Sequence, residues 1–475
     1  MKVTLAGATL DRRFWADDPA ATPETISAAY ARISHSPKRL KDLRDESVAQ
    51  VDKARRSNES IVYKMGHSSI AEHAVFNVDL EDCSRLLVEF IEGHRLASYT
   101  ERSQRYVFFG DKVPVVPSEF IGTGLDARLA DLDRRRFELY KEIASRDDLA
   151  SKYGDSLLEE ARYILGLTCP TDIGMTVNAR EAEHMIASGS SHTLSEVREF
   201  SEMLLSATGG LAPSLIRYTR GSEFKDMARS EVLSLIEEYV SEGKGADEMR
   251  CGCGSAVCSE IPCHGDDPES EIAAALIFEV TDRDMSECRS IARDLTDEEL
   301  KRLFRPQFEH YPVHSSLPRA FEMMDLVFDF EISASGFAQL KRHRMATIIT
   351  QGYSPSKWDT PSIMREDPNT TARYIELMKQ GQDLYNEVKA ALGEGPAQYC
   401  LCNANRRRVV LKMNLRELYH FVRLRSDVHA QTEIRSISDS LICVMKERYP
   451  VVTALLCGKD GYDKRRSELL SCKDL

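Results

Sequence analysis

Two arginine-rich stretches of the chain carry side chains that suit phosphate binding. The first, "EGHRLASYTERSQRYV", spans residues 92–107, and the second, "KRHRMATIITQGYSP", spans residues 341–355. A guanidinium group stays charged, and its planar fork of N–H donors matches the oxygens of a phosphate. The second stretch opens with Arg-His-Arg but lacks charged residues further on, whereas the first lacks the leading arginine and keeps Glu-Arg-Ser-Gln-Arg. The chain therefore holds two copies of one element, each incomplete in a different part.

Other segments repeat in the same order along the chain. Residues 67–106 and 314–355 both begin with His-Ser-Ser and later reach His-Arg. Residues 161–185 and 397–421 both contain Asn-x-Arg-Glu-x-x-His near their ends, and each is followed by a Glu-Val/Ile-Arg segment with helical spacing. Matches that keep their order over two halves of a chain indicate a tandem duplication.

The elements expected to position these residues are short strands among longer helices. Segments such as "HAVFNVDL" and "DLVFDFEI" alternate apolar and polar residues, which is typical of half-buried strands. We therefore predict the α+β class, with two tandem domains, each a mixed sheet with long helices. The predicted boundaries are residues 1–225 for the N-terminal domain, 226–270 for a linker helix with a cysteine-rich segment, and 271–475 for the C-terminal domain.

Composition narrows the classes of partner. The 475 residues carry a net charge of −13, which makes a poor platform for nucleic-acid phosphates or an anionic membrane. No apolar run approaches the ~20 residues of a transmembrane helix, and the N-terminus shows no secretory signal. We expect a cytoplasmic protein with reduced cysteines, a small-molecule ligand, and neither nucleic acid nor membrane as a partner.

Cysteines gather in the predicted linker. Thiolates and imidazole suit tetrahedral zinc, but the spacing is not that of paired Cys-x-x-Cys motifs. Two interpretations stay open: a structural metal site and reduced thiols in a flexible linker. We predict no metal in the chemistry, and the candidate ligands of the weaker alternative are Cys251, Cys253, Cys258 and Cys263, with His264 beside them.

These motifs resemble those of the flavin-dependent thymidylate synthases, the ThyX family. The matching stretches are "GHSSIAEH" (66–73), "NLRELYHFVRLRSDVHAQTEIR" (414–435) and the two arginine-rich stretches, and the resemblance covers both halves. It implies that each half corresponds to one subunit of a homotetramer whose sites are assembled from several subunits. It also implies FAD as cofactor, hydride from NADPH, and transfer of a one-carbon unit from methylenetetrahydrofolate to C5 of dUMP without a protein nucleophile.

The resemblance distributes the site residues unequally between the halves. The second half keeps the Arg-His-Arg clamp with its upstream glutamine and a downstream arginine: Gln339, Arg342, His343, Arg344 and Arg425. At the corresponding places the first half has Phe90, Gly93 and Gly189. The first half keeps the residues that hold dUMP in the family: Glu101, Ser103, Gln104, Arg105 and Arg162. The second half has Thr350, Gly352, Ser354 and Gln398 in place of the charged and hydroxyl members of this set.

A third group is assigned to cofactor binding in both halves. It comprises His67, Ser69 and Glu72 in the His-Ser-Ser element, and Asn178, Arg180, Asn414, Arg416 and His420 in the Asn-x-Arg elements; Arg342, His343, Arg344 and Glu101 are also expected to contact the cofactor. A helix N-cap is the alternative role for Ser68 or Ser69.

Arg425 is the predicted catalytic residue. A cation at the uracil edge stabilises the negative charge that develops as C5 becomes nucleophilic. The alternative is a surface salt bridge. Arg105 and Arg162 are predicted to neutralise the dUMP phosphate, and ordinary solvated charges are their alternative.

Because almost every part survives once, we expect the two halves to complete one site between them. A homodimer of the tandem chain would then imitate the family tetramer. Two other functions remain open at this point. One is a related flavoenzyme for another pyrimidine nucleotide, and the other is a non-catalytic protein that binds flavin or nucleotide.

Overall fold

The computed structural model describes residues 1–11, 22–221, 227, 231–232, 234–236, 259–261, 267–313 and 315–471. The chain folds into two compact units. Unit 1 contains residues 1–250 and 361–402, and unit 2 contains residues 251–360 and 403–475. Each unit has one four-stranded sheet with helices, so the predicted α+β class is confirmed.

Unit 1 contains one four-stranded sheet. Its strands run in the order β1 (Lys2–Ala8), β2 (Val75–Ser84), β4 (Pro170–Asn178) and β3 (Ala97–Glu101). Along β2, Phe76, Val78 and Leu80 are buried while the residues between them are exposed, which is the alternation seen in the sequence. All neighbouring strands are antiparallel, so the expected mixed sheet is wrong on this point. The connections between these strands contain helices, and such long connections allow either direction of pairing.

The helices of unit 1 come from both halves of the sequence. The first half contributes α1 (Glu24–Ile33), α2 (Leu40–Ala49), α3 (Val51–Glu59), α4 (Arg85–Glu92), α5 (Leu125–Ala144), α6 (Asp147–Tyr153), α7 (Leu157–Ala161), α8 (Ala179–Ser190) and α9 (Ser195–Thr208). The second half contributes α15 (Pro368–Leu392) and α16 (Glu394–Ala397). The predicted boundaries at 225 and 271 divide the sequence into its two repeats, and they stay predictions. The compact units of the folded chain divide it differently, because residues 361–402 of the second repeat pack with the first half.

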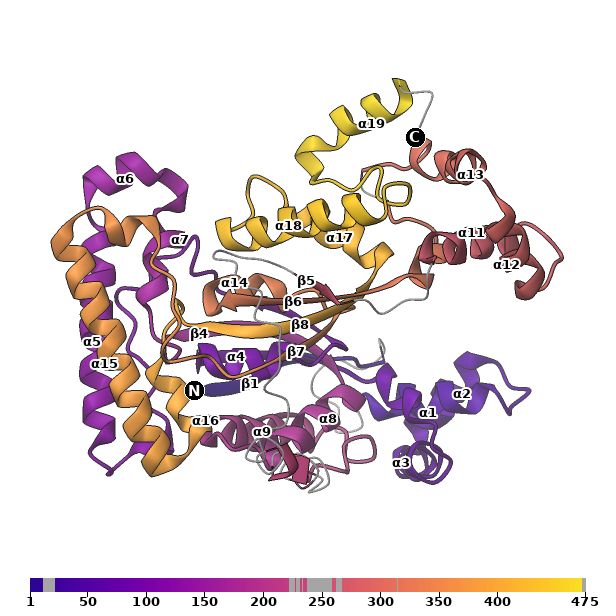
Figure 1. Cartoon of the computed structure of the whole chain (residues 1–475). Helices are drawn as coiled ribbons and strands as arrows, with labels where there is room; N and C mark the ends of the chain where they lie inside the picture. The colour runs from indigo at the N-terminus through magenta and orange to yellow at the C-terminus, as the bar shows by residue number, and fades with distance from the viewer. Residues whose placement is uncertain are drawn as a thin grey trace. The chain divides into compact units, whose positions relative to one another are not determined.

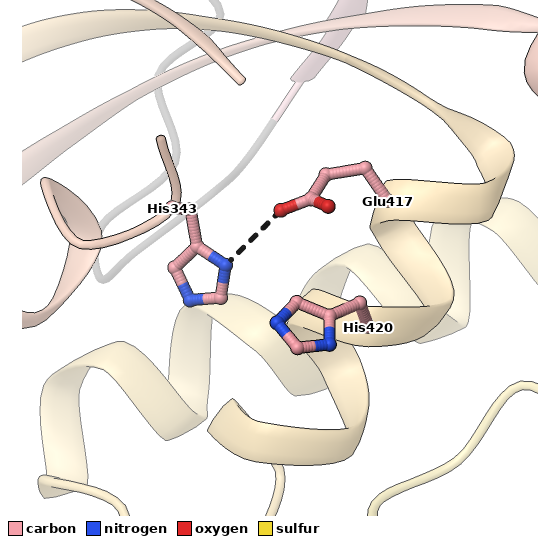
Figure 2. Close-up of side chains that lie close together, drawn as sticks. All are labelled: His343, Glu417 and His420. Carbon is pink, nitrogen blue, oxygen red and sulfur yellow. Dashed lines mark hydrogen bonds and ion pairs between the residues drawn. The ribbon is translucent and has the colours of Figure 1, made fainter. Parts of the chain in front are cut away.

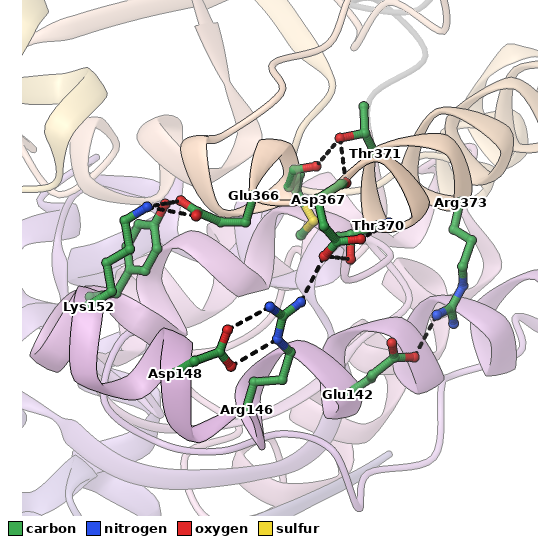
Figure 3. A network of polar contacts seen from close by, with 11 residues as sticks. Glu142, Arg146, Asp148, Lys152, Glu366, Asp367, Thr370, Thr371 and Arg373 are labelled. Carbon is green, nitrogen blue, oxygen red and sulfur yellow. Dashed lines mark hydrogen bonds and ion pairs between the residues drawn. The ribbon is translucent and has the colours of Figure 1, made fainter.

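Helix α15 lies along α5 (Figure 1), and charged side chains line this contact. Figure 3 shows Arg146 between Asp148 and Asp367, with its Nη1 2.8 Å from Asp367 Oδ2. Asp367 also caps α15, because its carboxylate accepts the Thr370 N–H at 2.8 Å, and proline follows at the first helical position. The start of the second-half helix is thus held by first-half side chains.

Unit 2 repeats the strand order of unit 1. Its sheet has the order β5 (Ser259–Ile261), β6 (Asp325–Ser333), β8 (Arg406–Asn414) and β7 (Thr347–Thr350), all antiparallel. Its helices are α11 (Pro268–Glu279), α12 (Met285–Asp294), α13 (Asp297–Glu309), α14 (Ala334–Leu340), α17 (Leu415–Arg425), α18 (Thr432–Arg448) and α19 (Tyr462–Ser471). They bury a core that includes Phe304, Phe321, Phe328, Leu411 and Phe421. None of the helices in the described residues combines the length and the apolar character that crossing a membrane requires.

Candidate functional site

The helix that carries the Arg-His-Arg element is fixed at its N-terminus in unit 2. Ser333 caps α14, because its Oγ accepts the Gly336 N–H at 3.1 Å. Glu433, in the first turn of α18, accepts the backbone N–H of Ser333 at 2.9 Å and also the Ser333 hydroxyl. A Cβ on Gly336 would lie 2.7 Å from Glu433 Oε2, so this close approach requires glycine. The helix therefore leaves the sheet in one fixed direction.

Unit 1 contains the same arrangement at the corresponding helix, α4. Ser84 Oγ accepts the Leu87 N–H at 3.0 Å, and Glu196 of α9 accepts the Ser84 N–H at 2.8 Å and its hydroxyl at 2.5 Å. Tyr399 donates a third hydrogen bond to Glu196, at 2.7 Å. Both copies thus position the segment after the helix in the same way, and what differs is the side chains that this segment carries.

In unit 2 the structure brings together three of the predicted residues: Gln339, His343 and Arg425. Arg425 ends α17 and donates from Nε to His343 Nε2 at 2.9 Å. Its other two nitrogens donate to the side-chain and backbone oxygens of Gln339, at 3.1 and 3.0 Å. Each of the three guanidinium nitrogens thus donates to its own acceptor. These contacts belong to a built cluster rather than to a solvent-exposed salt bridge.

The electrostatics of this cluster keep His343 neutral. Burial, with the charge of Arg425 as a further contribution, lowers the pKa of His343 to about 4. Because Nε2 accepts from Arg425, the ring proton sits on Nδ1, where Glu417 Oε1 lies 3.4 Å away. The arginine therefore selects the tautomer of the imidazole.

His343, Glu417 and His420 point toward one another in Figure 2, and their possible ligand atoms all lie within 4.8 Å. A metal bound at His343 Nδ1 would displace the proton to Nε2, against the N–H of Arg425. The contact with Arg425 therefore disfavours metal binding here and leaves Nδ1–H as a hydrogen-bond donor. His420 remains a candidate for contact with an organic cofactor.

The two arginines of the Arg-His-Arg element lie on the other side of the chain from the histidine. Arg342 and Arg344 are exposed, whereas His343 between them is buried. Arg342 Nε donates to the Ala338 carbonyl at 3.3 Å. This alternation presents guanidinium groups to an anion arriving from solvent while the imidazole supports Arg425.

In unit 1 two of the predicted nucleotide residues form ion pairs, one of them buried and the other partly buried. Glu101, at the end of β3, pairs with Arg85, and Arg105 pairs with Glu159. Arg162 is only 4% exposed, so it is not an ordinary solvated charge. Burial lowers the pKa of Arg162 to about 10, and the charges of Arg85 and Arg105 act in the same direction. The structure therefore places the buried Arg85 and Arg162 and the partly buried Arg105 near one another in unit 1.

The remaining members of this set are close by in the chain. Ser103 Oγ accepts the backbone N–H of Arg105 at 3.2 Å, and Gln104 is buried. At the matching positions of the second half, Ser354 Oγ lies 3.2 Å from Ser356 Oγ, and the Ser354 carbonyl accepts from Asn405 at 2.9 Å. The second copy therefore has a neutral turn where the first copy has a charged one.

The first copy has no space for its missing arginine. A Cβ on Gly189, which stands in the place of Arg425, would lie 2.0 Å from Ser201 Oγ and 3.2 Å from the Phe90 ring. Phe90, which stands in the place of Gln339, packs edge-on against His94 at 4.9 Å between ring centroids. His94 in turn shares hydrogen bonds with the Phe90 carbonyl and Ser188 Oγ. The glutamine–arginine contact of unit 2 has thus been replaced by aromatic packing.

The asparagines of the two Asn-x-Arg elements cap helices. Asn178 accepts the Glu181 N–H at 2.9 Å at the start of α8, and Asn414 accepts the Glu417 N–H at 2.8 Å at the start of α17. The neighbouring arginines are paired as well, Arg180 with Glu72 at 2.5 Å and Arg416 with Glu322 at 2.9 Å and the Leu317 carbonyl at 2.6 Å. Their assignment to a cofactor stays a prediction.

The His-Ser-Ser element of the first half forms a 3₁₀-helix over Ser68–His73. Its N-cap is His67 and makes no side-chain capping bond, so the capping alternative for Ser68 or Ser69 is wrong. His314, the second-half counterpart of His67, lies outside the described residues, as do Cys251, Cys253, Cys258, Cys263 and His264 of the predicted linker.

Sequence reasoning missed several residues that shape these clusters. The capping serines and their glutamates were detectable, because both occur at matching places in the two halves. Glu159 is the partner of a predicted residue but carries no motif of its own. Arg85 had no signal in the repeat, since alanine stands at the same place, residue 334, in the second half.

Comparison with known proteins gives matches over both halves. The profile of the family described as "Thymidylate synthase complementing protein" matches residues 18–214 and 263–451, which confirms the tandem duplication and the resemblance. A UPF0159 protein of Thermoplasma acidophilum is 25% identical over 457 residues, covering 83% of this chain and 87% of that protein. A flavin-dependent thymidylate synthase of Geobacter sulfurreducens is 31% identical over 199 residues, covering 41% of this chain and 81% of that protein.

Among solved structures, one of flavin-dependent thymidylate synthase ThyX from Helicobacter pylori, complexed with FAD and dUMP, is similar to this chain. The sequences are 19% identical, the TM-score is 0.33, and the match covers 46% of this chain and 100% of that chain.

Proposed function

Because the chain belongs to the thymidylate synthase complementing protein family and carries two copies of its domain, we propose that it is a flavin-dependent thymidylate synthase. It converts dUMP to dTMP by reductive methylation, with methylenetetrahydrofolate as carbon donor and NADPH as reductant. The observation that carries the proposal is the built contact of Arg425 with Gln339 and His343. The Geobacter sulfurreducens relative, named a flavin-dependent thymidylate synthase, supports the same activity.

The residues near Arg425 fit a flavin nucleotide. The exposed Arg342 and Arg344 would hold its pyrophosphate, and the buried His343 between them is neutral. His420, Asn414 and Arg416 follow on the same helix or at its start and complete the proposed cofactor set. In the first half the proposed cofactor contacts are His67, Ser69, Glu101, Asn178 and Arg180. When bound, FAD supplies the hydride chemistry of the reaction.

The chain's own residues have two tasks in this proposal. Arg425 places a fixed positive charge at the uracil edge and stabilises the negative charge that develops as C5 becomes nucleophilic. Arg105 and Arg162 neutralise the dUMP phosphate, and Ser103 and Gln104 add hydrogen-bond donors. The backbone and side chain of Gln339 keep the guanidinium of Arg425 oriented before substrate arrives.

We also propose that the two residue sets act in one site. Unit 1 retains the phosphate arginines and has filled the place of Arg425 with aromatic packing, whereas unit 2 retains Arg425 and has a neutral turn in place of Arg105. Neither unit alone holds both sets. A homodimer of the tandem chain would provide the equivalent of the family tetramer, with half as many sites. The cytoplasmic location stays a prediction from cysteine usage.

Product formation tests the activity directly. Purified protein is incubated without oxygen with FAD, NADPH, methylenetetrahydrofolate and dUMP, and dTMP is measured by mass spectrometry. Appearance of dTMP supports the synthase. Bound flavin without dTMP would move the assignment to another pyrimidine nucleotide, and absence of both would move it to a nucleotide-binding protein without catalysis.

Single substitutions test the shared site. Arg105→Ala and Arg342→Ala lie in different units, and each is expected to abolish dTMP formation on its own. Substantial activity in either variant contradicts the shared site. Mixing and refolding the two inactive variants then separates sites formed within a chain from sites formed across a dimer, because only the latter can regain activity in mixed dimers.

A further inference from the structure

Helices α5 and α15 of unit 1 contact each other through equivalent positions. Arg135 Nη1 of α5 donates to Gln380 Oε1 of α15 at 2.6 Å, and these two residues lie 245 positions apart in the chain. The same offset relates the buried faces of the helices. Every buried residue of α15 between positions 374 and 388 has a buried counterpart 245 positions earlier on α5, as Tyr385 has in Tyr140. The two helices therefore bury the same face.

Two ion pairs on either side of this central contact are related in the same way. Arg128 of α5 pairs with Glu387 of α15, with its Nη2 2.9 Å from Glu387 Oε1. Arg373 of α15 pairs with Glu142 of α5 at 2.6 Å, as Figure 3 shows. The two arginines correspond by the offset of 245, and so do the two glutamates. Such reciprocal contacts are the pattern of a two-fold interface between identical subunits. The α5–α15 contact therefore resembles a subunit interface that is made within one chain.

The buried centre of the contact is not symmetric. Arg136 of α5 faces Gly381 of α15, which is its own counterpart in the repeat. The Arg136 side chain is 1% exposed, and its Nη2 donates to the Cys400 carbonyl at 2.8 Å. A Cβ on Gly381 would meet this nitrogen. Asp133, which pairs with Arg136 at 3.1 Å, has the apolar Met378 as its counterpart. One helix thus supplies a large charged side chain, and the other supplies the space that holds it.

This asymmetry determines which helices can pair. Contact of α5 with the α5 of a second chain would place two Arg136 side chains where the structure has room for one, which overpacks a buried site and brings two like charges together. Contact of α15 with a second α15 would join two glycines and leave the space of the guanidinium group empty, which loses buried contacts. Pairing of α5 with α15 fills the centre once.

We propose that Arg136 and Gly381 form a knob-into-hole contact that makes α15 of the same chain the partner of α5 and prevents a second copy of the chain from binding at this face. The outer ion pairs suit a symmetric contact equally well, so the selectivity comes from the buried centre. Copies of the chain then assemble through a different surface. This inference does not depend on the proposed function.

Cross-linking in the full chain tests which helices meet. Because Arg135 and Gln380 are equivalent and in contact, a symmetric contact between two chains would bring position 135 close to position 135 of the second copy. Arg135→Cys, Gln380→Cys and the double variant Arg135→Cys/Gln380→Cys are treated with a bis-maleimide that spans about 10 Å, a typical distance between packed helices. Denaturing gel electrophoresis separates single chains from linked chains, and peptide mass spectrometry identifies the linked positions. Wild type gives the background from native cysteines.

We expect the double variant to show a link between positions 135 and 380 within single chains. No variant is expected to link position 135 to 135, or 380 to 380, between chains. Either of these links would overturn the proposal. A 135–380 link found only between chains, or its absence when both cysteines are modified, would overturn it as well.

A double-mutant cycle tests the knob-into-hole contact itself. Gly381→Arg is expected to lower the melting temperature of the full chain by about 5–10 °C, because a second guanidinium group enters the space that Arg136 fills. In the Arg136→Gly background the same substitution should lower it by less than about half as much, since that space is then free. Equal losses in the two backgrounds would refute the contact.

The control for this cycle is the exchange Arg135→Gln/Gln380→Arg, one position away on both helices. The Arg135 side chain is 33% exposed, so this exchange is expected to stay within about 2 °C of wild type. A loss as large as that of Gly381→Arg would show that the helix pair resists any change, and would contradict selectivity at the centre. If Gly381→Arg does not fold, Gly381→Ala is measured in the same two backgrounds.

Discussion

Gly381, in the middle of α15, is a position where helix propensity and packing predict opposite effects of one substitution. A methyl group added there would lie 2.4 Å from Arg136 Nη2 of α5 and 3.1 Å from the Cys400 carbonyl oxygen. By propensity alone, Gly381→Ala stabilises a helix by about 1 kcal/mol. The contact with Arg136 predicts the reverse, so the sign of the change decides which effect dominates.

The magnitude follows from how Arg136 is held. Its side chain is 1% exposed, Nη2 donates to the Cys400 carbonyl at 2.8 Å, and Nη1 donates to Asp133 at 3.1 Å. Moving Nη2 away loses a charged hydrogen bond in a buried site, which costs about 1.5–3 kcal/mol. Overpacking adds about 1–3 kcal/mol. After the propensity gain of about 1 kcal/mol is subtracted, we expect a net destabilisation of about 1.5–5 kcal/mol.

Chemical denaturation, followed by circular dichroism, measures this change in the full chain. Gly210→Ala is the control, because a methyl group there meets no atom within 4 Å and the residue belongs to the same unit. Since two units can unfold in separate steps, the transition that moves in Gly381→Ala is compared with the same transition in wild type. A variant that is as stable as wild type, or more stable, would refute the reasoning.

The same substitution reaches the candidate site through the backbone. Cys400 precedes Leu401, whose carbonyl accepts the Leu167 N–H at 2.9 Å, and Gly166 pairs with Cys402. Arg162 lies just before this bridge in the chain. We therefore expect dUMP to bind more weakly to Gly381→Ala than to the control, which links the stability of α15 to the phosphate arginines.

Three further predictions concern the two copies of the Arg-His-Arg element. Arg425→Ala is expected to lower kcat by about 10²- to 10³-fold while flavin stays bound, which steady-state kinetics and flavin absorbance measure. Arg425→Lys is not expected to restore kcat, because one ammonium group cannot replace three donors in a plane. The pKa of His343 is about 4 in the folded state, below its ordinary 6.5, so the unfolded state takes up the proton first as pH falls. The free energy of unfolding should therefore fall by up to about 3 kcal/mol as pH drops from 6.5 through 4. Denaturation curves of His343→Gln should lack this part of the pH dependence. Gly189→Arg should destabilise unit 1 through its contacts with Ser201 Oγ and the Phe90 ring, and Phe90→Gln should offset only the part that is due to the ring. A double-mutant cycle of Gly189→Arg and Phe90→Gln should then give a coupling of about 1 kcal/mol or more, and additive effects would contradict the contact with the ring.

Much of the fold was predictable because local patterns determine it. The alternation in β2 and β6 predicted strands, and the repeated motifs predicted two tandem domains of the same class; the structure adds that the two sheets share one strand order. The placement of α15 was not predictable. Its partner α5 lies in the other half of the sequence, and the ion pairs between them join residues that have no shared motif. Tertiary contacts between distant segments leave little trace in one sequence.

The candidate site, like the fold, was predictable only in part from the sequence. The motif identified Gln339, His343 and Arg425, although 86 residues separate the first from the last, and the structure shows the contacts among them. The motif did not show that Arg425 fixes the histidine tautomer, because this depends on burial and on the direction of one N–H. It also did not indicate Arg85, since its partner Glu101 is identified only when β3 and α4 are folded together.

Residues that contact each other in one copy have been lost together in the other copy. Gln339 and Arg425 touch in unit 2, and the first copy has lost both together, with an aromatic ring filling the space. Arg85 and Glu101 touch in unit 1, and the second copy has alanine and threonine in their places. Losing one member of a buried pair leaves an unsatisfied group that costs about 1–3 kcal/mol or more, whereas losing both can be nearly neutral. Once a duplicated chain no longer needs every part twice, whole contact pairs are therefore the units that each copy can discard, and a site divided between two incomplete copies is the expected result.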